Sequence, residues 1–204
     1  MAEFSVVPVT NENRGDAARA LADAFMTDDH IVAMLPAGST RERLRSLMMA
    51  QVSEMLAAGP GAVVAVDGET TLGAALWQSP GASTPWAAVL RNLPLYVRRL
   101  HRRFPDALRI TLSERRHQPR VPHWYLAYLG TPPAARGRGV GTALVQYGVD
   151  QARRDGVGAY LEASSRANVD YYKKFGFVEM GEVPAPGTSP TYAMWLPREQ
   201  HPAG

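Results

Sequence analysis

The feature that most constrains this chain is the run Arg136-Gly137-Arg138-Gly139-Val140-Gly141. An apolar and aromatic segment, residues 123–129, comes before it and predicts a strand, and the pattern of residues 142–149 predicts a helix. A glycine-rich turn that opens a helix directs several backbone N–H groups and the positive end of the helix dipole at one point. The two arginines add charge, and the glycines let a ligand approach bare backbone. We therefore expect a phosphate or pyrophosphate ligand at this turn.

The composition is that of an ordinary globular chain, with 46% apolar and 20% charged residues among 204. We expect a single domain over residues 1–204. The complete lack of cysteine excludes thiol catalysis, disulfides and cysteine metal sites, and it agrees with a cytoplasmic protein. No cluster of metal-ligand residues is visible, so no metal is expected. Since no apolar run approaches about 18 residues, we expect no membrane span and no membrane partner.

Arginine is unevenly distributed along the chain. One third of it holds nine: Arg91, Arg98, Arg99, Arg102, Arg103, Arg109, Arg115, Arg116 and Arg120. A solvated helix face is the first explanation, and a patch that guides an anionic cofactor is the second. Nucleic-acid binding comes last, and no nucleic-acid partner is expected.

Helices and strands alternate along the whole chain. The patterns predict strands over 4–9, 62–66, 72–78, 124–130, 159–163, 177–183 and 191–196, and helices over 11–25, 41–57, 86–100, 139–155 and 168–175. Residues 27–30 read as a polar loop, residues 102–122 as a helix followed by a loop, and Pro94 predicts a bend or break. The fold class is therefore α/β, with a mixed, mostly antiparallel central sheet flanked by helices.

Three phosphate-binding motifs compete for the glycine turn. A Walker loop needs Lys followed by Ser or Thr, but Gly141 is followed by Thr142-Ala143. A dinucleotide fingerprint needs G-x-G-x-x-G, but the spacing here is G-x-G-x-G and it occurs late in the chain. The third motif, Arg-x-x-Gly-x-Gly between a strand and a helix, fits best.

Residues 129–144 resemble the pyrophosphate loop of the GNAT family of acyl-CoA-dependent N-acyltransferases. Residues 168–177, Asn-Val-Asp-Tyr-Tyr-Lys-Lys-Phe-Gly-Phe, resemble its second signature. The resemblance implies the GNAT fold with a splayed strand pair, acetyl-CoA as cosubstrate and no metal. It implies acetyl transfer, by direct attack in a ternary complex, to a primary amine of a small molecule of the antibiotic or aminonucleoside kind. A homodimer is compatible with it.

The resemblance also implies roles for single residues. Backbone groups of Leu129 and Thr131 would bind the pantetheine arm and polarise the thioester carbonyl. The full set for acetyl-CoA would be Leu129, Gly130, Thr131, Arg136, Gly137, Arg138, Gly139, Val140, Gly141, Thr142, Asn168 and Tyr172. Asn168 would cap its helix, bind the pantetheine arm, or do both.

Tyr172 would protonate the departing thiolate, since its spacing to Gly176-Phe177 favours it over Tyr171. An aliphatic ammonium must lose a proton before it attacks, so a base is useful. Tyr125 stands at the usual family position for that base; we rank Glu162 first and His123 second as replacements.

Other readings stay open at this stage. Four aromatic residues, Trp124, Tyr128, Tyr192 and Trp195, could line an aromatic acceptor pocket, although sheet core is the more ordinary role. The acceptor could instead be a protein or peptide amine. The chain could also be a non-catalytic module that senses acyl-CoA or binds nucleic acid; the Tyr172 motif weighs against both.

Overall fold

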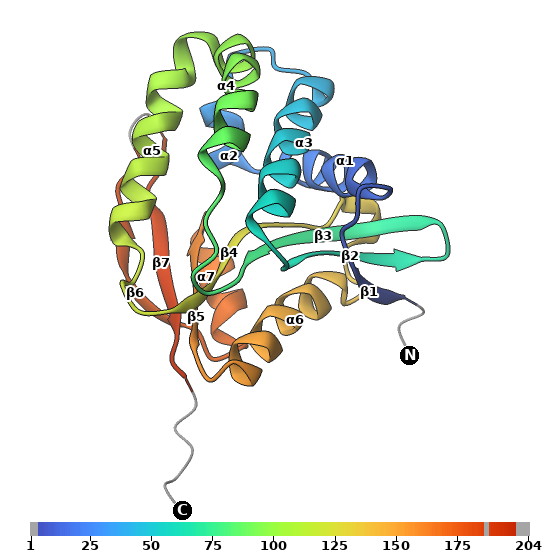
Figure 1. Ribbon diagram of the computed structural model, residues 1–204, viewed down its shortest axis with the longest axis vertical. Helices are drawn as coiled ribbons and strands as arrows, with labels where there is room; N and C mark the ends of the chain where they lie inside the picture. The colour runs from blue at the N-terminus through green and yellow to red at the C-terminus, as the bar shows by residue number, and fades with distance from the viewer. Residues whose placement is uncertain (1–3, 186–187, 199–204) are drawn as a thin grey trace, which may run out of the picture.

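One mixed sheet of seven strands organises the chain (Figure 1). The structure is a computed structural model, and it describes residues 4–185 and 188–198. The strands are β1 Ser5–Pro8, β2 Ala62–Asp67, β3 Thr70–Gln78, β4 His123–Gly130, β5 Gly158–Ala163, β6 Val178–Val183 and β7 Thr191–Leu196. Their order is β1-β2-β3-β4-β5-β7-β6. All neighbours are antiparallel except β4 and β5, which confirms the expected fold class.

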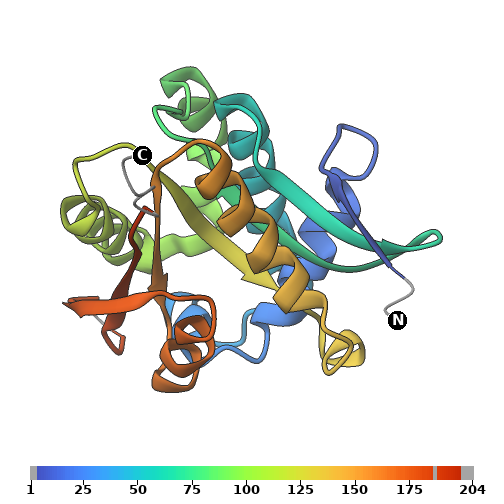
Figure 2. The same cartoon turned by 90° about the horizontal axis from the view of Figure 1, so that it is seen from below.

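Helices cover both faces of this sheet. They are α1 Arg14–Phe25, α2 Asp29–Met34, α3 Arg41–Ala58, α4 Trp86–Leu100, α5 Phe104–His117, α6 Val140–Arg154 and α7 Arg166–Lys173, with short 3-10 turns η1 His101–Arg103 and η2 Pro133–Ala135. Figure 1 shows α1 and α3 on one face and α6 on the other, and Figure 2 shows α6 crossing the sheet. No helix in the described part of the chain is both long and apolar enough to cross a membrane.

The α6 face has a close-packed core. Trp77 on β3 is fully buried and donates from Nε1 to the carbonyl oxygen of Leu144, 3.1 Å away. A Cβ atom at Gly148 would lie 2.0 Å from the indole, so only glycine lets α6 approach this ring. The close approach fixes α6, and with it the glycine turn at its start, against the sheet.

Two local expectations were wrong, and of the bend or break expected at Pro94 the break does not occur. Residues 29–34 form helix α2, which begins where Asp28 Oδ1 accepts from the N–H of Ile31. Helix α4 continues through Pro94 without a break. Ser165, not Asn168, caps α7, because its Oγ accepts from the N–H of Asn168 three residues later.

The segment after α4 follows its expectation: α5 ends at His117 and a loop leads to β4. The arginines that crowd this third of the chain lie on α4, η1, α5 and that loop, and all except the half-buried Arg99 are exposed. The placement of these arginines therefore agrees with the first explanation, a helix face exposed to solvent.

Candidate active site

Strands β4 and β5 pair for only part of their length. Their parallel register runs from His123 opposite Gly158 to Leu126 opposite Leu161 and goes no further. A β-bulge at Ala127 turns β4 at this point, since Leu76 faces Tyr128 while its neighbour Trp77 faces Leu126. Residues 127–130 of β4 and 162–163 of β5 therefore border an opening in the sheet.

The glycine turn lies directly after this opening. Gly137 and Gly139 have φ of +78° and +80°, a left-handed conformation that disfavours other residues. Gly139 caps α6, whose first N–H groups have no partner within the helix. A Cβ atom at Gly141 would lie 3.1 Å from the phenol oxygen of Tyr171 and 3.6 Å from Oγ1 of Thr131. This turn, with its free N–H groups, fits an anion such as a pyrophosphate.

Both arginines of the turn have local partners. Arg138 pairs with Asp67 at 2.8 Å, and Arg136 donates to Oγ1 of Thr27 at 3.0 Å. Gly130, at the end of β4, lets α1 approach so closely that a Cβ atom there would lie 2.9 Å from that of Ala24. The contacts of Arg136 with Thr27 and of Gly130 with Ala24 hold the end of α1, and Thr27 just after it, beside the opening.

Tyr172 lies in the core on the α6 side of the sheet. It is 8% exposed, and its ring meets that of Phe177 with centroids 6.0 Å apart. Burial, followed by the nearby Tyr171 and Asp28, raises the pKa of the Tyr172 phenol. The phenol therefore stays protonated at neutral pH and can serve as a proton donor. Tyr171 instead directs its oxygen to the start of α6.

A hydrogen-bonded chain ties α7 to the α1–α2 connection. Nδ2 of Asn168 donates to Oγ of Ser164 at 3.0 Å, and that hydroxyl donates to Oδ2 of Asp28 at 2.9 Å. Asp28 also caps α2 through its other oxygen. The side chain of Asn168 thus positions these elements.

Glu162 faces the opposite side of β5. It follows Tyr160 by two residues, so both side chains leave the strand on one face, whereas Leu161 and Ala163 join the core that contains Tyr172. Burial raises the pKa of Glu162 to about 7, although the adjacent phenols of Tyr125 and Tyr160 oppose the rise. Its Oε1 is buried and has no hydrogen-bond partner within residues 4–185 and 188–198.

His123 lies at the other end of β4, where the two strands are still paired. Its Nδ1 is 2.7 Å from the carbonyl oxygen of Val121, and its ring packs edge-on against Tyr160 and Trp195. This placement favours Glu162 over His123 as the base.

The four aromatic residues considered for an acceptor pocket have different surroundings. Trp124 is core and donates to Asp155 at 2.8 Å. Tyr192 carries the guanidinium of Arg166 3.9 Å above its ring, and half-buried Trp195 packs against His123. Only Tyr128 is electrostatically coupled to Glu162; burial raises its pKa first, and nearby carboxylates add to the rise.

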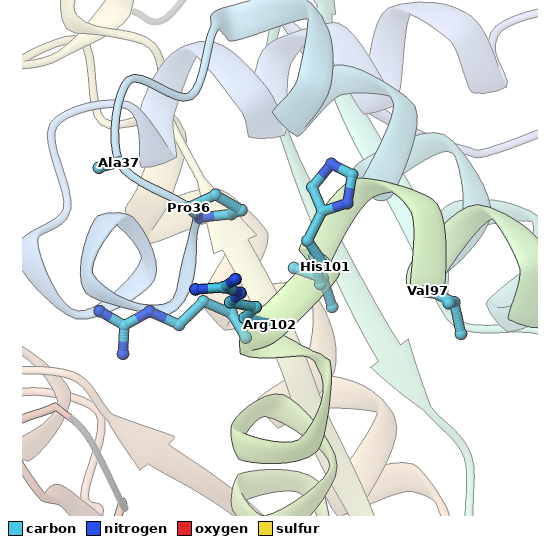
Figure 3. A pocket seen from close by; sticks show the side chains of 7 residues that line it. Pro36, Ala37, Val97, His101 and Arg102 are labelled. Carbon is cyan, nitrogen blue, oxygen red and sulfur yellow. The ribbon is translucent and has the colours of Figure 1, made fainter.

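A separate open hollow of about 820 Å³ lies at the corner between α4 and α5 (Figure 3). Its walls include His101, Arg102, Arg103 and the segment Pro36-Ala37. Two guanidinium groups would repel an ammonium ion. The hollow therefore does not suit an amine acceptor.

A splayed parallel pair, a glycine turn and a crossover helix define the fold of acyl-CoA-dependent N-acyltransferases. The chain belongs to the acetyltransferase (GNAT) family, whose model matches residues 39–177. It is an acyl-CoA-dependent N-acetyltransferase, and the family uses acetyl-CoA.

Individual relatives agree with this assignment. An uncharacterised N-acetyltransferase of Schizosaccharomyces pombe is 25% identical over 172 residues, covering 79% of this chain and 69% of the relative. A Corynebacterium glutamicum structure described as a histone acetyltransferase and related acetyltransferase is 28% identical, with a TM-score of 0.75 and coverage of 98% and 99%. Arylalkylamine N-acetyltransferase 2 of Aedes aegypti has a TM-score of 0.67 over 95% and 98% of the two chains; at 13% identity it shows the shared fold alone.

Proposed function

We propose that this enzyme transfers the acetyl group of acetyl-CoA to a primary amine of a small molecule. The observation that carries the proposal is the end of β4–β5 pairing at Leu126 and Leu161, next to the glycine turn. A cosubstrate with an extended arm and a pyrophosphate matches both features, since the arm can lie along the free edge of β4 while the turn binds the anion.

The residues that would hold acetyl-CoA follow from this placement. Backbone groups of Leu129, Gly130 and Thr131 border the opening, and residues 136–142 form the anion-binding turn. Bound acetyl-CoA supplies an acetyl group activated as a thioester. Backbone N–H groups of β4 at the opening provide donors for the developing oxyanion.

Two proton transfers are assigned to opposite faces of β5. Glu162, with a pKa near neutrality, takes a proton from the incoming ammonium and leaves the nitrogen lone pair free. Tyr172, on the other face, keeps its proton at neutral pH and gives it to the departing sulfur. The opening between β4 and β5 lies between these groups.

For the acceptor, we infer an amine of the antibiotic or aminonucleoside kind. The segment from Trp124 to Pro197 resembles puromycin N-acetyltransferase, including Tyr160-Leu161-Glu162-Ala163-Ser164-Ser165 and the ending Pro190-Thr191-Tyr192-Ala193-Met194-Trp195. Because the Corynebacterium glutamicum structure is described as a histone acetyltransferase, a lysine peptide is the second candidate acceptor. We place the reaction in the cytoplasm, with which the cysteine-free composition agrees.

The test is release of CoA thiol from acetyl-CoA with puromycin, an aminoglycoside, a polyamine and a lysine peptide. Tyr172→Phe should lower kcat by about 10²- to 10⁴-fold, the usual range for a lost general acid. Binding of acetyl-CoA should not change, because the phenol acts on the leaving group. Tyr147→Phe is the matched control, since this half-buried tyrosine lies two turns into α6, away from the glycine turn.

Each outcome has a distinct meaning. Release with puromycin supports the small-molecule proposal, and release with the peptide alone replaces it. If acetyl-CoA binds but no amine causes release, the catalytic proposal fails and an acyl-CoA sensor takes its place. Equal kcat in Tyr172→Phe and the wild type would remove Tyr172 from the mechanism.

A further inference from the structure

The acceptor side of β4 and β5 holds a cluster of phenols and carboxyls. Tyr125 and Tyr160 are register partners, and their ring centroids lie 6.0 Å apart. Glu162 follows on the same face, where pairing stops. The phenol oxygen of Tyr160 and Oε1 of Glu162 are both buried without a hydrogen-bond partner in the described part of the chain. The two groups are close enough to affect each other's pKa, but neither oxygen has a well-formed hydrogen bond in the described part of the chain, so the place suits a polar ligand.

Helix α5 brings a second carboxyl to this cluster. Oγ of Ser113 donates to the carbonyl oxygen of Pro184 at 2.8 Å, which fastens α5 beside β6 (Figure 1). Glu114, the next residue, is half-buried, whereas Arg115 and Arg116 are exposed. Burial first, and then the charge of Glu162, raise the pKa of Glu114 to about 8.

Within residues 4–185 and 188–198, neither carboxyl forms a salt bridge. The described ion pairs with nearby arginines involve Asp106, Glu179 and Glu182, but not Glu114 or Glu162. His117 lies one turn along α5 from Glu114, and it lowers the pKa of Glu162 against the effect of burial. A half-buried carboxyl pair without an ion-pair partner destabilises the fold, so its presence beside an opening suggests a cationic ligand.

We propose that Glu114 and Glu162 together receive the ammonium group of the acceptor, while Tyr128 and Tyr125, whose ring packs against the fully buried Tyr160, flank an aromatic body attached to it. This inference rests on the function proposed above and names the acceptor as a monocationic arylalkylamine. Two neighbouring buried carboxyls do not both ionise readily, so the pair carries about one negative charge and balances one ammonium. The rings add stacking and cation–π contacts.

In this arrangement the two carboxyls have different tasks. Glu162 lies at the opening, and one of its oxygens takes a proton from the ammonium nitrogen, whose lone pair then attacks the acetyl carbonyl. Glu114 lies on α5, outside the sheet, and holds the cation without receiving the reacting proton. Glu114 is therefore an acceptor-binding residue, and its loss should change KM more than kcat.

The experiment compares tyramine, butylamine and putrescine as acceptors by CoA release. The variants are Glu114→Gln, Glu114→Asp and the control Glu69→Gln, which lies exposed on the β2–β3 hairpin. For the wild type we expect tyramine to give the highest kcat/KM. Glu114→Gln should raise the KM for tyramine about tenfold, as expected for loss of one charge-assisted hydrogen bond, with little change in kcat. Glu114→Asp should restore part of the affinity.

Two measurements keep the inference separate from the proposed function. Binding of acetyl-CoA and the melting temperature are recorded for every variant, so a misfolded protein is recognised. If the wild type transfers acetyl groups but Glu114→Gln keeps the wild-type KM, or putrescine or butylamine is preferred to tyramine, the inference is overturned while the function stands. If the folded wild type binds acetyl-CoA and releases no CoA with any amine, both are overturned.

Discussion

Burial gives Tyr172 and Glu162 their opposite proton-transfer roles. Loss of hydration disfavours the charged form of both groups, so both pKa values rise. For a phenol this means firm retention of the proton, which suits a donor to the leaving thiolate. For a carboxyl it means a pKa of about 7, which suits an acceptor of the ammonium proton at neutral pH. One physical effect thus prepares an acid on one face of β5 and a base on the other.

The pH dependence of catalysis should report the base. For the wild type, log kcat/KM should rise with pH and level off above about pH 7, because Glu162 is a base only when ionised. Glu162→Gln should be slower and should keep rising through pH 8.5, since its rate depends on the small fraction of free amine. Initial rates of CoA release from pH 5.5 to 8.5 measure both profiles, with Glu69→Gln as control. A plateau retained in Glu162→Gln would exclude Glu162 as the base.

Single residues differed in how far the sequence could predict them. Tyr172 and Glu162 were candidates because a motif spacing and a strand end mark their positions. Glu114 was missed, because it lies in a segment whose conspicuous feature is arginine. Its burial depends on α5 packing beside β6, a long-range contact that leaves no local pattern.

At the scale of elements, Asp28 joins three parts of the site. It caps α2, accepts from Ser164 after β5 and, through Ser164, connects to Asn168 on α7. Asp28→Ala should lower stability by about 1–2 kcal/mol, as for a lost cap, and should also lower kcat, because α7 carries Tyr172. Thr40→Ala is the matched control: Thr40 caps α3 through the N–H of Arg43, away from the site.

Thermal unfolding and CoA release distinguish the two variants. Both should lose a similar few degrees of melting temperature, taking about 2–4 °C per kcal/mol for a chain of this size. Only Asp28→Ala should lose activity at 25 °C. Equal activity in the two variants would show that the Asp28 contacts stabilise the fold without positioning the site.

Helices and strands were predicted correctly where an apolar pattern repeats along the sequence. The prediction failed where a single capping hydrogen bond determines the conformation. The crossover helix and the β2–β3 hairpin have clear apolar patterns and turn residues, and both were found. Helix α2 has only six residues, too few for a helical period, and depends on its Asp28 cap. The cap of α7 was misplaced by three residues because Ser165 and Asn168 are both good capping residues.

Across the whole molecule, positive charge is concentrated in residues 86–120, the helical cover formed by α4, η1, α5 and the loop that follows. Residues 86–120 contain nine arginines and two acidic residues, Asp106 and Glu114, whereas the whole chain has a net charge of only +3. The arginines lie on α4, η1, α5 and the loop that follows, while Glu114 is directed inward and half-buried. We infer that this cover attracts anions on its outside and an ammonium ion on its inside. We further propose that residues 1–204 form one domain, since a single sheet takes strands from both ends of the described chain.

The half-buried carboxyl pair of Glu114 and Glu162 should also make stability depend on pH. In the folded protein the pKa of Glu162 is about 7 and that of Glu114 about 8, above the ordinary 4.5 of the unfolded chain. From about pH 4.5 up to pH 7 to 8, the native state therefore binds more protons than the unfolded state. The stabilisation is complete below about pH 4.5 and is lost as pH rises through 7 to 8. The double variant Glu114→Gln/Glu162→Gln lacks this dependence, so its melting temperature should rise relative to the wild type between pH 6.5 and 8.5.

This pH window separates the carboxyls from His30. Burial lowers the pKa of His30 below 6.5, so its effect on stability has the opposite sign and ends near pH 6.5. With about 1.4 kcal/mol per pKa unit and 2–4 °C per kcal/mol, the double variant should gain roughly 5 °C on the wild type across the window. Differential scanning fluorimetry at half-unit steps measures the gain, with Glu69→Gln as the reference. If the difference in melting temperature between the double variant and the wild type does not change with pH, the two carboxyls are hydrated and ionised in the free enzyme. The acceptor would then meet two negative charges instead of one.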